Sequence, residues 1–324
     1  MISEKLLIVN FGGPRSLDEV ESFLISLLTD RDLISSKMPD FLHRWFFTYI
    51  AKKRARKVKH DYDLIGGGSP IFGDTEFIAE SVSKEIGLPF LTFHRYLAAT
   101  HTLFIKQMQE ETSTRFTVFP LFPQFSYTTT GSIARWFTTH LSASIVQRLE
   151  WVSSYSDDSA YIEVMAKLIQ EFLHSYKLNE SETILLFSAH GLPKSYIDKG
   201  DGYENECKRS FEKIASYFPE ALSQLSYQSK FGKEEWLRPY TDEFCKEILS
   251  PRRNDKQVVF IPLSFTSDHV ETLYEIEYQY LPLVEKRGLK AYRAPALNRR
   301  SDWIRAIGQM IAKRPRVANQ FLYK

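Results

Sequence analysis

The sequence predicts an α/β protein of two Rossmann-like halves, each a doubly wound and mostly parallel sheet, that enclose an interdomain cleft. Short apolar runs alternate with longer segments of helical period, which is typical of parallel strands covered by helices on both faces. The alternation restarts after residue 155, and both halves begin with a similar strand and turn. We therefore expect an N-terminal half over 1–155 and a C-terminal half over 156–324.

The first half is expected to alternate strands and helices from its start. The expected strands are KLLIVN (5–10), PFLTF (89–93) and FTVFPLF (116–122), and the expected helices cover 17–28, 101–111 and 132–149.

The second half is expected to follow the same pattern. Its expected strands are TILLFSAH (183–190), LSQLSYQS (222–229), QVVFIPLSF (257–265) and LKAYRA (289–294), and its expected helices cover 159–176, 204–218, 270–286 and a segment from Ser301.

The first strands of the two halves resemble each other. LLIVNFGGPRS (6–16) and LLFSAHGLPKS (185–195) share two leucines, a glycine, a proline and a serine. Chance and ordinary turn chemistry are the alternative to a duplication. If the halves are duplicated, Phe11 and His190 occupy equivalent places at the carboxyl end of a strand, where ligands bind in open parallel sheets.

Composition excludes several classes of protein. The chain has 324 residues, 43% of them hydrophobic, which suffices for a sizeable core. Its net charge of +2 indicates no nucleic-acid partner. Cys207 and Cys245 lie too far apart for a cysteine-ligated cluster and argue against a disulfide framework. The N-terminal apolar run is too short for a signal peptide or a membrane span. We expect a cytoplasmic monomer.

Candidate reactive residues cluster at two strand ends of the second half. His190 ends an apolar strand. The alternative to a functional role is a structural histidine that is hydrogen-bonded within the fold. In SFTSDHVETLYEIEYQ (264–279), the spacing of Asp268, Glu271 and Glu275 predicts that they share one helix face. A solvated acidic face is the alternative, but apolar neighbours and the preceding strand favour a site. Carboxylates with a neutral imidazole suit a divalent first-row metal such as Fe²⁺, held loosely.

Two segments of the first half suit a bulky apolar ligand. In DYDLIGGGSPIFG (61–73) the three glycines lack the lysine of a phosphate loop and the spacing of a dinucleotide fold, so close backbone approach to a large ligand is an equally good account. The segment 41–59 places aromatic residues before basic ones. It is either an amphipathic helix with a solvated basic end, an interfacial membrane contact, or a source of cations for the carboxylates of a ligand.

The motifs together resemble the ferrochelatase family, the chelatases that insert Fe²⁺ into a porphyrin in haem synthesis. The resemblance covers nearly the whole chain, in the order NFGGP, DRDLI, IGGGSPI, FHRY, FPQFSYTTTGS, FSAHGLP, YQSKFGKEEWL and FTSDHVETLYEI. It implies Fe²⁺ and a porphyrin, protoporphyrin IX or coproporphyrin III, as substrates.

The resemblance also implies roles for individual residues. His190 and Glu271 are similar to the catalytic pair that meets the metal, with His190 either binding iron or accepting a pyrrole proton. Asp268 and Glu275 resemble an acid path for metal delivery or proton exit. The N-terminal half would carry a porphyrin-contacting lip. The porphyrin contacts implied over both halves are Phe11, Arg54, Tyr62, Ser69, Arg95, Tyr96, Phe265 and Trp236.

The chain departs from some relatives in two respects. The turn over 124–127 has no cysteine and the chain ends without the cysteine extension of those relatives, so we expect no [2Fe–2S] cluster and no permanently bound cofactor. Gln279 stands where some relatives carry a further carboxylate, which leaves a second, outer metal site without one of its acids. A porphyrin-binding or metal-binding protein and a Co²⁺ or Ni²⁺ chelatase are the alternative functions.

Overall fold

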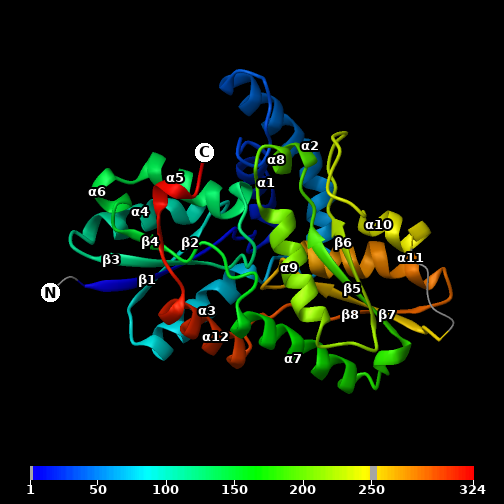
Figure 1. Cartoon of the computed structure of the whole chain (residues 1–324). Helices are drawn as coiled ribbons and strands as arrows, with labels where there is room; N and C mark the ends of the chain where they lie inside the picture. The colour runs from blue at the N-terminus through cyan, green and yellow to red at the C-terminus, as the bar shows by residue number, and fades with distance from the viewer. Residues whose placement is uncertain (1–2, 249–253) are drawn as a thin grey trace. The chain divides into compact units, whose positions relative to one another are not determined.

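The computed structural model describes residues 3–248 and 254–324, which form two compact units. Unit 1 comprises residues 1–154 and 307–324, and unit 2 comprises 155–306. Each unit has a sheet of its own (Figure 1). The sequence placed 156–324 in one half, but the last residues group with unit 1 because a short C-terminal strand pairs there with an edge strand.

The sheet of unit 1 is parallel except at that edge. Its order is β2-β1-β3-β4-β9, and only β9 is antiparallel to its neighbour. The strands are β1 (Glu4–Asn10), β2 (Phe90–His94), β3 (Arg115–Pro120), β4 (Leu149–Trp151) and β9 (Val317–Ala318).

Helices pack on both faces of this sheet. Leu7 and Val9 belong to a core with Phe104 and Phe137 from two helices on one side, and α3 contacts β1 and β2 on the other. The helices are α1 (Val20–Leu28), α2 (Asp40–Leu64), α3 (Ile71–Ile86), α4 (His101–Glu110), α5 (Ser132–His140) and α6 (Ala143–Val146), with the π-helix η3 (Tyr127–Gly131) and the 3-10 helices η1 (Leu17–Glu19), η2 (Ala98–Thr100) and η7 (Asn319–Phe321).

The expected helix over 132–149 was wrong in its length. It is divided into α5 and α6, and its last residue begins β4. Leu141 leaves the helical region with an extended backbone, and the apolar Leu149 and Trp151 are then used as an edge of the sheet beside β3.

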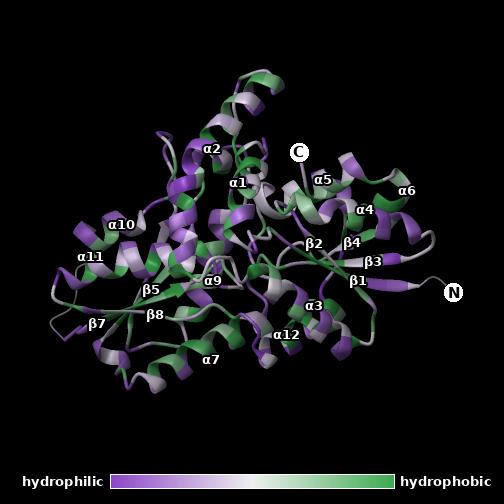
Figure 2. Cartoon of the chain, turned by 180° about the vertical axis from the view of Figure 1, so that it is seen from behind, coloured by the Kyte–Doolittle hydropathy of each residue, from purple (hydrophilic) through white to green (hydrophobic). Residues whose placement is uncertain are grey.

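The sheet of unit 2 is wholly parallel, with the order β6-β5-β7-β8. The strands are β5 (Thr183–His190), β6 (Leu222–Gln228), β7 (Gln257–Pro262) and β8 (Lys290–Arg293). β5 and β7 are buried along nearly their full length and appear in the hydrophobic colour in Figure 2. Central parallel strands read as continuous apolar runs because both faces are covered.

Alternate residues of β5 face different helices. Ile184 and Leu186 pack in a core with Ile276 and Val284, whereas the ring of Phe187 meets a ring from α9. The helices are α7 (Ser159–Ser175), α8 (Lys194–Asp198), α9 (Tyr203–Ala215), α10 (Thr241–Glu243), the π-helices η5 (Phe244–Ile248) and η6 (Glu271–Tyr280), α11 (Leu281–Glu285) and the short η4 (Glu180–Glu182); α12 (Ser301–Lys313) leads from unit 2 into unit 1.

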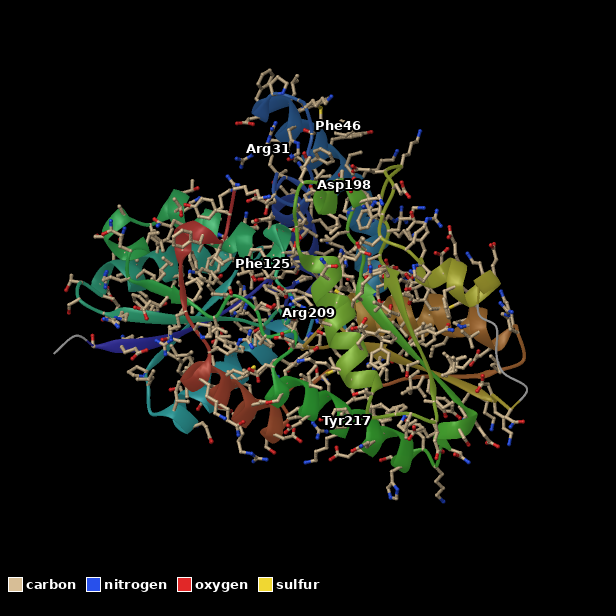
Figure 3. The ribbon with its side chains drawn as sticks, in the orientation of Figure 1. Arg31, Phe46, Phe125, Asp198, Arg209 and Tyr217 are labelled. Atoms are coloured by element: carbon tan, nitrogen blue, oxygen red, sulfur yellow. The ribbon has the colours of Figure 1, made fainter. Side chains whose placement is uncertain are left out.

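Helix α2 exposes a row of large apolar side chains near its N-terminal end. Phe41, Trp45 and Tyr49 are 71%, 69% and 56% exposed, and Figure 3 labels Phe46 in the same turn of the helix. Across the described ranges, no helix combines the length and apolar character that crossing a bilayer requires.

Candidate functional site

His190 is the last residue of β5, at the carboxyl end of the parallel sheet of unit 2. Its backbone N–H donates to the Ser264 hydroxyl at 2.8 Å, and its carbonyl accepts from the Tyr203 hydroxyl at 2.9 Å. The next residue is glycine because a Cβ there would lie 2.9 Å from the Gln228 carbonyl oxygen. The hydrogen bonds with Ser264 and Tyr203 and the close packing at Gly191 therefore fix the backbone at the end of β5 and with it the orientation of the imidazole.

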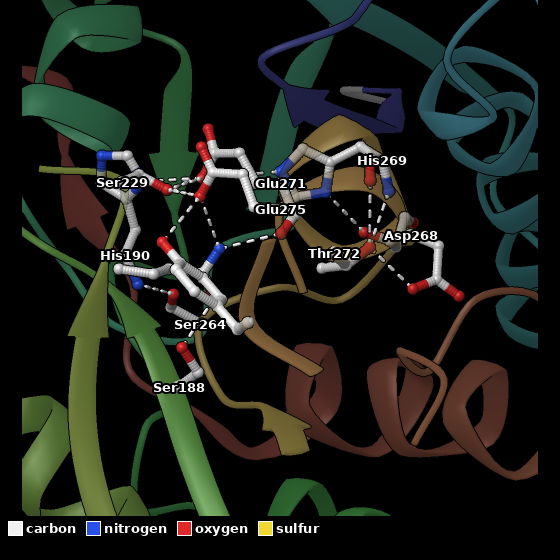
Figure 4. A network of polar contacts seen from close by, with 12 residues as sticks. Ser188, His190, Ser229, Ser264, Asp268, His269, Glu271, Thr272 and Glu275 are labelled. Atoms are coloured by element: carbon white, nitrogen blue, oxygen red, sulfur yellow. Dashed lines mark hydrogen bonds and ion pairs between the residues drawn. The ribbon is translucent and has the colours of Figure 1, made fainter. Parts of the chain in front are cut away.

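The imidazole of His190 is paired with Glu271, the first residue of η6. Nδ1 lies 2.7 Å from Oε2 of the carboxylate (Figure 4). The side chains are 35% and 26% exposed, so the pair borders solvent. Since Nδ1 donates to Glu271, a neutral ring carries its lone pair on Nε2. In the described part of the chain, no hydrogen bond engages Nε2.

Opposing effects act on the charge of this pair. Burial disfavours the imidazolium, but the charge and the hydrogen bond of Glu271 outweigh burial and raise the pKa of His190. Burial likewise disfavours the carboxylate, and the charge and hydrogen bond of His190 hold the pKa of Glu271 below its usual range. The arrangement therefore stabilises a protonated imidazole beside an ionised carboxylate.

Glu275 lies one helical step behind Glu271 and shares a hydrogen-bond donor with it. The Ser229 hydroxyl lies 2.6 Å from Oε2 of Glu275 and 3.2 Å from Oε2 of Glu271. The Gln228 amide donates to Glu275 as well, at 3.1 Å. Burial and the neighbouring charge of Glu271 raise the pKa of Glu275. The structure thus brings His190, Glu271 and Glu275 together, as the sequence predicted.

The third expected acid is not part of this group. Asp268 lies in the loop before η6, and its carboxylate accepts from Thr272 at 2.8 Å, Arg293 at 2.9 Å and Asn298 at 2.7 Å. The expectation of one α-helical face bearing all three acids was wrong, because the helix begins after Asp268 and its first ten residues are a π-helix. Gln279 is exposed on the same helix.

Rings surround the His190 imidazole within unit 2. Phe265 and Trp236 each lie with ring centroids 6.4 Å from it, and Phe265 also contacts His269 at 4.8 Å. Burial lowers the pKa of His269, and its Nδ1 donates to the Ser267 carbonyl at 3.2 Å. Phe265 and Trp236, which the family resemblance implied as ligand contacts, thus lie beside the His190 and Glu271 pair.

Three expected contacts of unit 1 lie at strand ends. The ring of Phe11, directly after β1, contacts Tyr96 at 5.2 Å. Arg95 and Tyr96 follow β2, and both donate to one carboxylate oxygen of Asp30, at 2.8 and 2.7 Å. Ser132 donates to the same oxygen at 2.6 Å. Tyr96 is fully buried, so the chain itself already uses the polar groups of this pair.

The remaining expected contacts lie on or after α2. Arg54 is exposed and Tyr62 is buried on that helix. Ser69 is 8% exposed, and its hydroxyl has no hydrogen-bond partner among the described residues. Gly68 is required by close approach, since a Cβ there would lie 2.6 Å from the Arg15 carbonyl oxygen. The close approach predicted for this glycine segment is therefore to the chain's own turn after β1.

Sequence reasoning gave no individual role to several polar residues of these groups, some of which stand in the quoted motifs, namely Asp30, Ser132, Tyr203, Gln228, Ser229 and Ser264. Gln228 ends β6 and Ser229 follows it. The strand-end rule that selected His190 would also have selected these two residues had it been applied to β6.

The described residues of the two units show no resident metal site. Within 3–248 and 254–324, no three His, Cys, Asp or Glu side chains are arranged to hold a metal ion. The His190 and Glu271 pair offers two potential ligands, which suits an ion that is bound briefly and passed on.

Comparisons with known proteins agree on one family. A sequence model described as Ferrochelatase matches residues 4–315. Proteins named ferrochelatase from Chlamydia caviae and Chlamydia abortus are 42% and 43% identical over 324 residues, covering 100% of this chain and of theirs. One from Chlamydia pneumoniae is 39% identical and covers 100% of this chain and 97% of its own.

Solved structures share the fold at low identity. CbiX, described as the terminal enzyme for biosynthesis of sirohaem in denitrifying bacteria, has a TM-score of 0.53 at 13% identity, covering 95% of this chain and 98% of its own. SirB from Bacillus subtilis with Fe³⁺ has a TM-score of 0.55 at 11% identity, covering 96% and 94%. The expected Rossmann-like fold class is confirmed by these two likenesses.

Proposed function

The chain belongs to the ferrochelatase family, and we propose that it inserts Fe²⁺ into a porphyrin, a step of haem synthesis, using His190 and Glu271. The observation that carries this assignment of residues is the 2.7 Å contact between Nδ1 of His190 and Oε2 of Glu271. Insertion requires that two pyrrole N–H protons leave while the ring nitrogens take the metal.

His190 is the proton acceptor in this proposal. Its Nδ1 donates to Glu271, so Nε2 holds the lone pair that accepts a pyrrole proton. The imidazolium that forms is stabilised by the carboxylate, in the way a carboxylate supports a catalytic histidine. A raised pKa also favours the use of His190 as a base over its use as an iron ligand, since Nε2 cannot hold a proton and a metal together.

Glu271 offers iron a contact without leaving His190. Its contacts with His190 and Ser229 both involve Oε2, and in the described ranges no hydrogen bond engages Oε1. Glu275 then receives protons passed on from this pair, because burial beside Glu271 favours its protonated form. For Asp268 the contacts support a different role, which is to hold the loop before η6.

The porphyrin contacts are proposed from residue type and exposure. Arg54 is an exposed cation suited to a propionate, and the buried hydroxyl of Ser69 has an unused hydrogen-bonding capacity. Phe265 and Trp236 supply ring surface beside His190. Phe11 supplies apolar surface in unit 1, whereas Tyr62 is buried on α2 and supports the contact region from within. Arg95 and Tyr96 are held by Asp30, and the Tyr96 ring contacts Phe11.

An anaerobic assay of the purified chain with Fe²⁺ tests this function. Appearance of the metalloporphyrin spectrum with protoporphyrin IX or coproporphyrin III is expected, and the ratio of the two rates identifies the substrate. Parallel reactions with Co²⁺ and Ni²⁺ separate an iron chelatase from related chelatases. Porphyrin binding with no insertion of any metal would instead indicate a binding protein.

We also propose that the protein needs no iron–sulfur cluster and acts as a cytoplasmic monomer. A cluster of that kind takes four protein ligands, most often thiolates, and the chain has two cysteines, Cys207 and Cys245, both buried. Iron analysis of the purified protein tests for a cluster, and sedimentation at several concentrations tests whether the protein is a monomer.

Peripheral membrane contact through α2 is a further part of the proposal. The exposed Phe41, Trp45 and Tyr49 line a groove with Arg44 and Lys52, and aromatic residues beside cations are typical of helices that lie at an anionic membrane surface. Sedimentation with vesicles rich in phosphatidylglycerol is expected to carry the protein down. The double substitution Trp45→Ser and Tyr49→Ser is expected to abolish sedimentation with the vesicles. Wild-type protein that stays in the supernatant would contradict the proposed membrane contact.

A further inference from the structure

A chain of buried polar side chains in unit 2 leads from β5 and β6 to the two acids. Ser188 and Ser226 are register partners on β5 and β6. Both hydroxyls contact the Thr241 hydroxyl, at 3.2 and 2.9 Å. The Ser188 hydroxyl donates to Oε1 of Gln228 at 2.7 Å. All four residues are at most 1% exposed, and buried polar groups at such a place need one another as partners.

The hydrogens available determine the direction of the bonds next to Gln228. The Ser188 hydroxyl donates to Oε1 of Gln228, so its one hydrogen is used and it accepts from Thr241. The Ser226 hydroxyl contacts the Thr241 hydroxyl and, at 3.5 Å, the Phe187 carbonyl. At the other end, the Gln228 amide nitrogen faces the backbone carbonyl of Glu271 at 2.9 Å and Oε2 of Glu275 at 3.1 Å. Both of these atoms are acceptors, so the two amide hydrogens are used there.

The acids need these donors in order to stay close together. The carboxylates of Glu271 and Glu275 both contact the Ser229 hydroxyl. Two carboxylates that share one donor repel each other when both are ionised. One hydroxyl has one hydrogen and therefore serves one carboxylate at a time. Ser229 itself lies in the left-handed region, with φ of 64°, where a side chain is strained. Gln228 supplies the additional hydrogens, one to the helix backbone and one to a carboxylate.

We propose that Gln228 is a positioning residue for metal insertion: its amide fixes the first turn of η6 and thereby holds Glu271 and Glu275 in place relative to His190. This inference rests on the proposed function. Gln228 accepts from the Gly191 N–H through its backbone, so the same residue is tied to the end of β5 and to the start of η6. It acts through the acids and not on the substrate.

The test is Gln228→Met, which keeps the side-chain length and removes both donors. We expect kcat to fall about 10–100-fold, the usual effect of removing a residue that orients a ligand of a metal site, with KM for porphyrin unchanged. The matched control is Gln257→Met. Gln257 is also buried in this sheet and donates to Thr183 at 2.9 Å, at the opposite end of β5; its substitution is expected to lower stability and leave kcat unchanged.

A wild-type kcat in Gln228→Met, or an equal loss in Gln257→Met, would overturn the proposal, and so would a rise in KM alone. Should Gln228→Met give no folded protein, Ser188→Ala decides. This smaller change removes the donor to Oε1 and frees the amide to turn, so kcat is expected to fall with KM unchanged, and a wild-type kcat would overturn the inference. If the wild-type protein itself shows no chelatase activity, the proposed function is disproved, and the role of Gln228 in it falls with it.

Discussion

The Nδ1 atom of His190 lies 2.7 Å from Oε2 of Glu271, so a base at the end of β5 is joined to an acid at the start of η6. The contact links residues 81 positions apart in the chain. It fixes which ring nitrogen stays available for chemistry, and the predictions below start from it.

Replacement of His190 should separate binding from chemistry. His190→Ala is expected to abolish metal insertion while porphyrin still binds, because the base is lost and the proposed ring contacts remain. Turnover is measured from the metalloporphyrin spectrum and binding from porphyrin fluorescence. His174→Ala, at the exposed end of α7, is the control and should behave as wild type. Near-normal turnover by His190→Ala would disprove its role.

The rate of insertion should rise with pH as His190 loses its proton. Burial disfavours the charged ring, but Glu271 outweighs burial and raises the pKa of His190 above the ordinary value of about 6.5. The raised pKa of His190 therefore contributes stability that is fully present below about pH 6.5 and is lost as pH rises through the folded-state pKa.

Glu271→Gln should lose most activity, keep the fold, and move the remaining rise in rate to lower pH, since only burial and the more distant Glu275 then act on His190. Rates measured at a series of pH values with saturating porphyrin test this. An unchanged profile would show that Glu271 does not set the protonation of His190.

Asp268 should matter more for stability than for the chemical step. Asp268→Ala leaves the Arg293 guanidinium, 13% exposed, without its buried partner, which is expected to cost about 3–5 kcal/mol. Glu277→Gln removes the other carboxylate on Arg293, which is 41% exposed, and should cost less than about 1 kcal/mol. Urea unfolding measures both. Equal costs would contradict the assignment of Asp268 to the loop before η6.

The glycine after His190 should tolerate no side chain. Gly191→Ala places a Cβ 2.9 Å from the Gln228 carbonyl oxygen and 3.1 Å from Trp236, so we expect a loss of about 1–3 kcal/mol together with reduced kcat as His190 shifts. Gly202 has no heavy atom within 4 Å of its Cβ position and a φ of −80°. Gly202→Ala should therefore be neutral in both measurements. Thermal unfolding and turnover of the two variants provide the comparison.

The long periodic elements were predictable from the sequence, and the short irregular ones were not. The strand over 183–190 was expected with the bounds that β5 has, because an apolar run between turn residues carries its own signal. β4 and β9 are three and two residues long. They form by pairing with strands at the edge of the sheet, β4 with β3 and β9 with β4. The change from α-helix to π-helix over 271–280 likewise leaves no mark in residue spacing.

Part of the candidate site was predictable from residue type and from position at the ends of expected strands. His190, Glu271 and Glu275 were chosen because they stand at or just after the ends of expected strands, where sites form, and because they match motifs of the family. Asp268 was chosen by the same spacing and lies instead with Arg293 and Asn298. Spacing places side chains correctly only if the helix has already begun, and the start of η6 depends on hydrogen bonds from other strands.

By itself the sequence determined the family, the alternation of strands and helices, and the presence of a histidine at the end of β5. Those properties are local, since they depend on residue type and on periods of two to four residues. Only the tertiary structure decided which ring nitrogen of His190 is paired, which acids join it, and that Gln228 and Ser229 lie between them. Those contacts join separate strands and helices, and such distances follow from packing and hydrogen-bond geometry that no short stretch of sequence contains.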